Sequence, residues 1–298
     1  MAGGGAAAGG LRIAASGGTG QPLLLLLHGM GATGDVWRGW AELLAERWPG
    51  RWLAPDLPGH GGSAPLDRYS FGPFAAALAG LFVPGDRVVV LGHSLGGAVG
   101  LALAGQASAE LAGQVPTEPA GRGADSAEPG GRGPDSAEPG GTGPGWGVEA
   151  VVGLGVKVGW TADELGRAAA LAARPVGWYD SRAEAAQRHL RVSGLVGIVE
   201  PDDPVVDGGL VASGDGRWRL AMDPRAFGVG APEMAGLLSA ASAPVLLARG
   251  EHDPMVGSAE LARFGVPSDT LSGLGHNAHV EDPAAVLALL REFYDVRS

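Results

Sequence analysis

The stretch from Arg87 to Gly100 constrains the fold more than any other part of the chain. The aliphatic run Val88 to Leu91 has the composition of a buried strand, and it ends abruptly at Gly-His-Ser-Leu-Gly, in which the serine is Ser94. An Ala- and Leu-rich segment of helical composition follows. Glycines two residues before and after the serine permit a turn so sharp that the serine is held in a strained conformation. The pattern therefore predicts a strand, a tight turn that presents Ser94, and a helix.

Apolar runs alternate with helical segments on both sides of this stretch. Leu23 to Leu27 is continuously aliphatic, and the segments Val148 to Val158 and Pro244 to Ala248 are rich in aliphatic residues. Strands that are apolar on both sides are typical of a parallel sheet that helices cover on both faces. We therefore predict an α/β fold whose mostly parallel sheet has eight strands or slightly fewer.

The other segments divide the chain into a core, a linker and a lid. Residues 1–10 are rich in Gly and Ala, and we expect them to be disordered. Residues 113–147 contain a polar ten-residue sequence that occurs twice almost unchanged, which predicts a disordered linker far from Ser94 that the chemistry does not need. Residues 161–241 leave the sheet where a strand ends, so we expect them to form a lid over Ser94. The predicted α/β core consists of residues 11–112, 148–160 and 242–298.

Composition limits the partners of the chain. The net charge of −11 argues against a nucleic-acid partner, because phosphate binding favours a basic face. The chain contains no cysteine, and its N-terminus does not resemble a secretory signal. Its longest purely aliphatic run, Leu23 to Leu27, is too short to span a bilayer. We therefore expect a cytoplasmic protein without a membrane or nucleic-acid partner, and the sequence leaves its oligomeric state open.

Two further residues lie where a reactive serine needs partners. A serine hydroxyl requires a histidine to take its proton and an acid to orient that histidine. Reactive groups of α/β sheets gather where parallel strands end, and Asp253 and His276 each follow a predicted strand. His279 competes with His276, but His276 directly follows the strand and is favoured, which leaves His279 as a packing or hydrogen-bonding residue. His276, His279 and Glu281 have a spacing that can ligate a metal ion, yet no further ligand is implied, so no metal is predicted.

The order of these motifs resembles the α/β-hydrolase superfamily. The matching motifs are HGMG at 28–31, DLPGHGGS at 56–63, GHSLGG at 92–97, GEHDPM at 250–255 and GLGHNAHVEDP at 273–283. The resemblance implies that Ser94 is the nucleophile, Asp253 the acid and His276 the base. It also implies an oxyanion hole made by the backbone N–H groups of Leu95 and Met30, and it requires no cofactor.

The expected reaction is cleavage of a carboxylic ester or thioester of a small molecule through an acyl-enzyme on Ser94. The same residues also support C–C bond hydrolysis, lyase chemistry or cofactor-free perhydrolase activity. C–C hydrolases of this kind depend on lid arginines that hold substrate carboxylates, and Arg174, Arg182, Arg188 and Arg191 are available. A non-catalytic ligand receptor is a weaker alternative, because such a protein would normally lose part of the triad.

Overall fold

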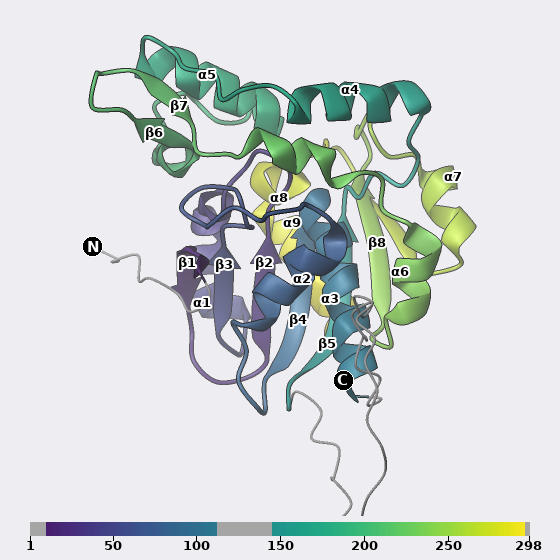
Figure 1. Ribbon diagram of the computed structural model, residues 1–298. Helices are drawn as coiled ribbons and strands as arrows, with labels where there is room; N and C mark the ends of the chain where they lie inside the picture. The colour runs from purple at the N-terminus through teal and green to yellow at the C-terminus, as the bar shows by residue number, and fades with distance from the viewer. Residues whose placement is uncertain (1–9, 112–144, 296–298) are drawn as a thin grey trace, which may run out of the picture.

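The computed structural model describes residues 10–111 and 145–295, which are built around a seven-stranded sheet (Figure 1). The strands lie in the order β1-β3-β2-β4-β5-β8-β9. Neighbouring strands are parallel except β1 and β3, which are antiparallel, so the expectation of a mostly parallel sheet is confirmed. The strands of this sheet are β1 (Ile13–Gly17), β2 (Leu23–Leu27), β3 (Trp52–Pro55), β4 (Arg87–His93), β5 (Gly147–Leu154), β8 (Val245–Gly250) and β9 (Ser268–Leu271).

The five leucines of β2 explain why the sheet is covered on both faces. Successive side chains of a strand point to opposite faces. Leu24 and Leu26 accordingly join one hydrophobic core, and the other three leucines join a second one. All five are 0% exposed. Since burying a leucine contributes about 2 kcal/mol, this strand is stable only between two layers of helices.

Helices from different parts of the chain form these two layers. Trp37, Leu44 and Leu290 pack in the core that contains Leu24, whereas Phe74 and Leu101 pack in the core that contains Leu25. The first layer holds the 3-10 helix η2 (Gly34–Trp40), α1 (Ala41–Arg47) and α9 (Pro283–Asp295). The second layer holds α2 (Phe71–Ala79), α3 (Leu95–Leu111) and α6 (Met234–Ala240). Short helices α7 (Ser258–Leu261), η5 (Ala262–Phe264) and α8 (Ala278–Glu281) lie in the connections of the C-terminal third.

A separate group of elements lies across one end of the sheet (Figure 1). The group consists of α4 (Ala162–Ala172), α5 (Arg182–Ser193), η3 (Pro204–Gly209), the two-stranded sheet of β6 (Leu210–Ala212) and β7 (Trp218–Leu220), and η4 (Pro224–Val229). The range proposed as a lid, 161–241, also includes α6, but α6 packs beside α3 in the second layer. We use the name "lid" below for residues 161–229.

The end of α3 and the start of β5, which flank residues 112–144, lie away from the lid. Helix α3 runs for 17 residues from the turn at Ser94, a length of about 25 Å. Strand β5 begins beside Arg87, at the first residue of β4. Most of the predicted linker, and residues 1–9 of the predicted disordered segment 1–10, lie outside the described residues. In the part of the chain that the structure describes, no helix is both long and apolar enough to cross a membrane.

Candidate active site

Ser94 occupies the turn between β4 and α3 in a strained backbone conformation. Its φ is 49°, and it is the only non-glycine residue with a positive φ among residues 10–111 and 145–295. The left-handed conformation costs an L-residue roughly 1–2 kcal/mol. The surrounding packing holds it there, because the Ser94 N–H donates to the carbonyl oxygen of Leu154 in β5 at 2.8 Å. The serine is half-buried and faces the lid.

The two glycines of the turn are required by close backbone contacts. A Cβ on Gly92 would overlap the carbonyl group of Gly96. A Cβ on Gly96 would overlap the carbonyl oxygen of Leu27 at the end of β2. Neither contact can relax by rotation of a side chain, since both partners are backbone atoms. The sequence argument for glycine on both sides of Ser94 is confirmed by this geometry.

The structure brings Asp253 and His276 into direct contact. Asp253 follows β8 and is buried, and its Oδ2 lies 2.9 Å from Nδ1 of His276. Its Oδ1 accepts a hydrogen bond from the backbone N–H of Met255 at 2.8 Å, which fixes the rotation of the carboxyl group. A carboxylate at Nδ1 holds the proton on that nitrogen and leaves Nε2 free to accept another. The contact therefore fixes both the tautomer and the orientation of the His276 ring.

A hydrogen bond from His93 holds the backbone of His276 in place. Its Nε2 lies 3.0 Å from the carbonyl oxygen of His276, and because a carbonyl only accepts, His93 carries its proton on Nε2. The two rings lie 4.7 Å apart between centroids. Burial lowers the pKa of His93 well below its ordinary value, so this donor stays neutral. The GHS motif contains His93, but nothing in the motif predicts a contact with a residue 183 positions away.

Gly155 leaves room for the Asp253–His276 pair. It follows β5 with a φ of 63°, and a Cβ there would lie 3.2 Å from the His276 ring and 3.4 Å from Oδ2 of Asp253. Its N–H donates to the carbonyl oxygen of Ala248 at 2.7 Å. Sequence reasoning did not identify this residue, since an isolated glycine after a strand is common.

His279 does not take part in the pair. Its ring is buried between those of His93, at 4.3 Å, and Trp37, at 4.6 Å. Burial lowers the pKa of His279 to about 3. The interpretation of His279 as a packing residue is confirmed by these contacts. No group of three or more His, Asp or Glu side chains in the described ranges is arranged to hold a metal ion.

Two backbone N–H groups beside Ser94 are available as donors. Leu95 is the first residue of α3, and the N–H groups in the first turn of a helix have no acceptor within it. Met30 lies in the turn after β2, and its N–H makes no hydrogen bond within residues 10–111 and 145–295. Both residues line the same cavity as Ser94. The partial positive charge at the start of α3 adds to their effect on an anion.

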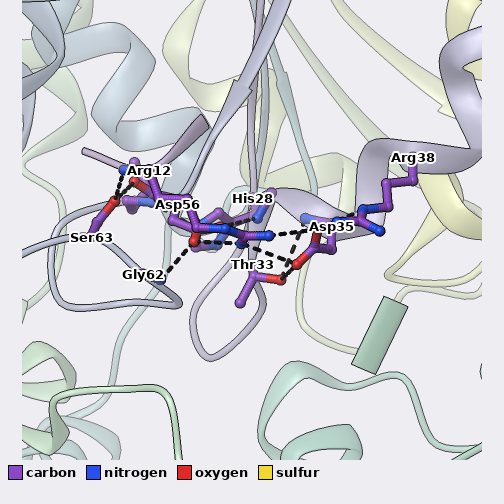
Figure 2. Close-up of polar contacts among 10 residues, drawn as sticks. Arg12, His28, Thr33, Asp35, Arg38, Asp56, Gly62 and Ser63 are labelled. Atoms are coloured by element: carbon purple, nitrogen blue, oxygen red, sulfur yellow. Dashed lines mark hydrogen bonds and ion pairs between the residues drawn. The ribbon is translucent and has the colours of Figure 1, made fainter. Parts of the chain in front are cut away.

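A buried ion cluster fixes the loop that carries Met30. Figure 2 shows Arg12 between Asp56 and Asp35, with Nη1 at 2.8 Å from Oδ2 of Asp56 and 3.1 Å from Oδ2 of Asp35. Asp56 also accepts from the N–H of Gly34 at 2.8 Å, which ties the loop after β2 to the loop after β3. Both carboxylates are almost completely buried. The cluster therefore holds the backbone that follows Met30 in the chain.

His28, which precedes Met30 in the chain, connects the same two loops. Its Nε2 accepts the N–H of Leu57 at 2.8 Å, so Nδ1 carries the proton and donates to the carbonyl oxygen of Gly29 at 2.8 Å. Burial lowers the pKa of His28 to about 4, which keeps this neutral arrangement. His28 therefore stabilises the loop that follows β2.

The cavity above Ser94 has a volume of about 400 Å³ and is walled mainly by apolar side chains, which come from both the lid and the core. Leu165 and Leu171 of α4 form one wall, and Phe227 of η4 lies beside them. Lys157 and Glu164 line the cavity as an ion pair at 2.8 Å, so their charges cancel, and Arg167 lines it as a further cation. A pocket of this size and polarity accommodates a small molecule that is mostly apolar.

Comparisons with solved structures agree with this architecture. A thioesterase domain from the curacin biosynthetic pathway superimposes with a TM-score of 0.64 at 19% identity, covering 94% of each chain. E-2-(acetamidomethylene)succinate hydrolase gives 0.64 at 20% identity and covers 96% of this chain and 94% of that one. An esterase of M. tuberculosis gives 0.64 at 21% identity and covers 97% and 90%. At this level of identity the likeness concerns the fold.

Sequence relatives match a shorter stretch. An uncharacterized protein of Mycobacterium tuberculosis is 42% identical over 93 residues, which are 30% of this chain and 26% of that protein. The magnesium-chelatase 30 kDa subunit of Rhodobacter capsulatus is 44% identical over 84 residues, 27% of this chain and 29% of that protein. The matched stretch thus spans less than a third of either relative.

The profile of the alpha/beta hydrolase family matches residues 24–289. This range contains the serine turn, the lid and the Asp253–His276 pair, and the sheet around them has the arrangement of the solved hydrolases. The chain therefore belongs to the alpha/beta hydrolase family.

Proposed function

We propose that the protein is a serine hydrolase that cleaves a carboxylic ester or thioester through an acyl-enzyme on Ser94. The observation that carries the proposal is the 2.9 Å hydrogen bond that orients His276 on Asp253, together with the strained turn that presents Ser94. The ring of His276 contacts that of His93, the neighbour of Ser94 in the chain. Membership of the hydrolase family and the likeness to an esterase and a thioesterase support the same reaction class.

In the acylation step, Nε2 of His276 accepts the hydroxyl proton of Ser94 while Oγ attacks the carbonyl carbon. The carbonyl oxygen becomes negative, and the N–H groups of Met30 and Leu95 donate to it, each contributing roughly 3–4 kcal/mol to the transition state. His276 then gives the proton to the departing alcohol or thiol as the bond to the acyl carbon breaks. Asp253 stays ionised and stabilises the imidazolium throughout.

In the deacylation step, His276 takes a proton from water, and the resulting hydroxide attacks the acyl carbon. The bond to Oγ breaks, Ser94 recovers its proton from His276, and the carboxylic acid leaves. The reaction requires only groups of the chain and water.

The test is hydrolysis of p-nitrophenyl esters of increasing acyl length by wild type, Ser94→Ala and Ser258→Ala. Loss of the nucleophile should lower kcat by about three orders of magnitude or more, while removal of the exposed Ser258 hydroxyl should leave kcat unchanged. Equal turnover by wild type and Ser94→Ala would contradict the proposal. Modification of Ser94 by a fluorophosphonate without turnover of any ester would instead favour the C–C hydrolase alternative.

A further inference from the structure

A second cavity of about 340 Å³ adjoins the one above Ser94. The two cavities share Leu171, Val192 and Phe227 as wall residues, so they are neighbouring parts of one space beneath the lid. Arg174 and Arg188 line the second cavity and no carboxylate does, whereas the first cavity is lined by the Lys157–Glu164 pair and by Arg167.

The two arginines line this space from the end of α4 and from α5. Leu171 lies in the last turn of α4, and Arg174 lies two residues beyond the end of that helix, in the connection to α5. Arg188 and Val192 are four residues apart on α5 and therefore share a face. Arg188 is half-buried there, and Arg174 is exposed at the rim.

Neither of these guanidinium groups has a hydrogen-bond or ion-pair partner within residues 10–111 and 145–295. Three other lid arginines are paired with carboxylates, Arg182 with Asp207 at 2.6 Å, Arg217 with Asp215 at 2.7 Å and Arg225 with Asp223 at 2.7 Å, whereas Arg167 and Arg191 form no ion pair within the described residues. The chain as a whole carries a charge of −11, so carboxylates are plentiful. Two cations without a partner in a substrate-sized cavity therefore favour the binding of an anion that the chain itself does not supply.

We infer that Arg174 and Arg188 bind an anionic group, a carboxylate or phosphate, at the end of the substrate remote from the bond that Ser94 cleaves. This inference rests on the proposed function and narrows its substrate class. Guanidinium groups bind such oxyanions through two parallel N–H donors, and the apolar wall shared by the two cavities fits the chain between the anion and the ester. The anion belongs either to the acyl part or to the leaving group.

Two matched pairs of substrates test the inference and separate these sources. For the acyl part, p-nitrophenyl esters that end in a carboxylate are compared with methyl-ended esters of the same length. For the leaving group, acyl thioesters of coenzyme A, which carry phosphates, are compared with neutral N-acetylcysteamine thioesters. Each is measured with wild type, Arg188→Gln, the double variant Arg174→Gln/Arg188→Gln, and Arg191→Gln as a control. Arg191 lies on the same helix but is exposed and lines neither cavity.

We expect the anionic member of one pair to have the higher kcat/KM with wild type and Arg191→Gln. The double variant should lose about tenfold or more of that kcat/KM, because a hydrogen bond to a charged group is broken, while the neutral member changes little. Added salt should weaken the preference, since Arg174 is exposed. No preference in either pair, or a preference that the double variant retains, overturns the inference. Turnover of the neutral esters that depends on Ser94 would leave the proposed function standing in that case.

Discussion

Acid should unfold this protein at an unusually mild pH, because five histidines are buried in it. His28, His60, His93, His189 and His279 are each at most 3% exposed. Burial lowers the pKa of His28 and His189 from 6.5 to about 4, and that of His60 and His279 from 6.5 to about 3. Burial also lowers the pKa of His93 well below its ordinary value.

The sign follows from which state binds more protons. The unfolded chain takes up protons as the pH falls through 6.5, whereas the folded protein does not until about pH 4 or lower. The stability that depends on neutral histidines is therefore complete above pH 6.5 and is lost progressively as the pH falls toward 4. Each histidine removes about 1.4 kcal/mol per pH unit in this window. Four of them together remove about 5 kcal/mol per unit, which is comparable with the whole stability of a typical domain.

Urea unfolding followed by tryptophan fluorescence measures this effect, since the chain contains 8 tryptophans. The free energy of unfolding should fall by several kcal/mol between about pH 7.5 and about pH 5.5. The variant His279→Phe should reduce the slope by about 1.4 kcal/mol per pH unit, whatever its effect on the stability at neutral pH. The control His252→Gln should leave the slope unchanged, because His252 is exposed. A free energy that is flat over this range would refute the assignment of buried neutral histidines.

Three substitutions test other parts of the account. Asp253→Asn should lower kcat for ester hydrolysis by as much as about 10⁴-fold, since the amide no longer holds the productive tautomer of His276, and should leave KM nearly unchanged. Gly155→Ala should reduce kcat more than it reduces the free energy of unfolding, because its Cβ would press on the His276 ring at 3.2 Å; a normal kcat would contradict the role given to Gly155. Arg12→Ala should cost about 3 kcal/mol in urea unfolding, because it leaves the buried Asp56 carboxylate without a cation and leaves Asp35 with only the half-exposed Arg38. The control Arg38→Ala, whose side chain is 48% exposed, should cost less than about 1 kcal/mol, and equal losses would show that burial of the cluster does not matter.

Local patterns explain what the sequence could predict. Strand β2 and the turn at Ser94 each depend on a few consecutive residues. The leucines of β2 are explained by burial on both faces of the sheet, and Gly92 and Gly96 are explained by close contacts with backbone atoms. The pairing of Asp253 with His276 was predictable because both residues follow strands and parallel strands end at one edge of a sheet.

Long-range contacts were beyond the reach of the sequence. The donation from His93 to the backbone of His276 depends on how two distant loops meet. The same limit applies to the lid arginines, because the sequence does not distinguish Arg174, Arg182 and Arg188 from one another. The folded lid does: Arg182 is paired with an aspartate, and the other two line a cavity. Helix periodicity predicts which side of a helix a residue occupies, but it does not predict which distant residue that side chain contacts.

The most direct test of the central claim, that Ser94 is a nucleophile activated by His276, is covalent labelling by a fluorophosphonate followed by intact-mass analysis and peptide mapping. Wild type should gain the mass of one phosphonyl group, mapped to Ser94, and the reaction should slow greatly in His276→Ala while His279→Ala remains reactive. Ser94→Ala should gain no mass. Labelling of Ser94→Ala to the same extent as wild type, or of wild type at another residue only, would contradict the account.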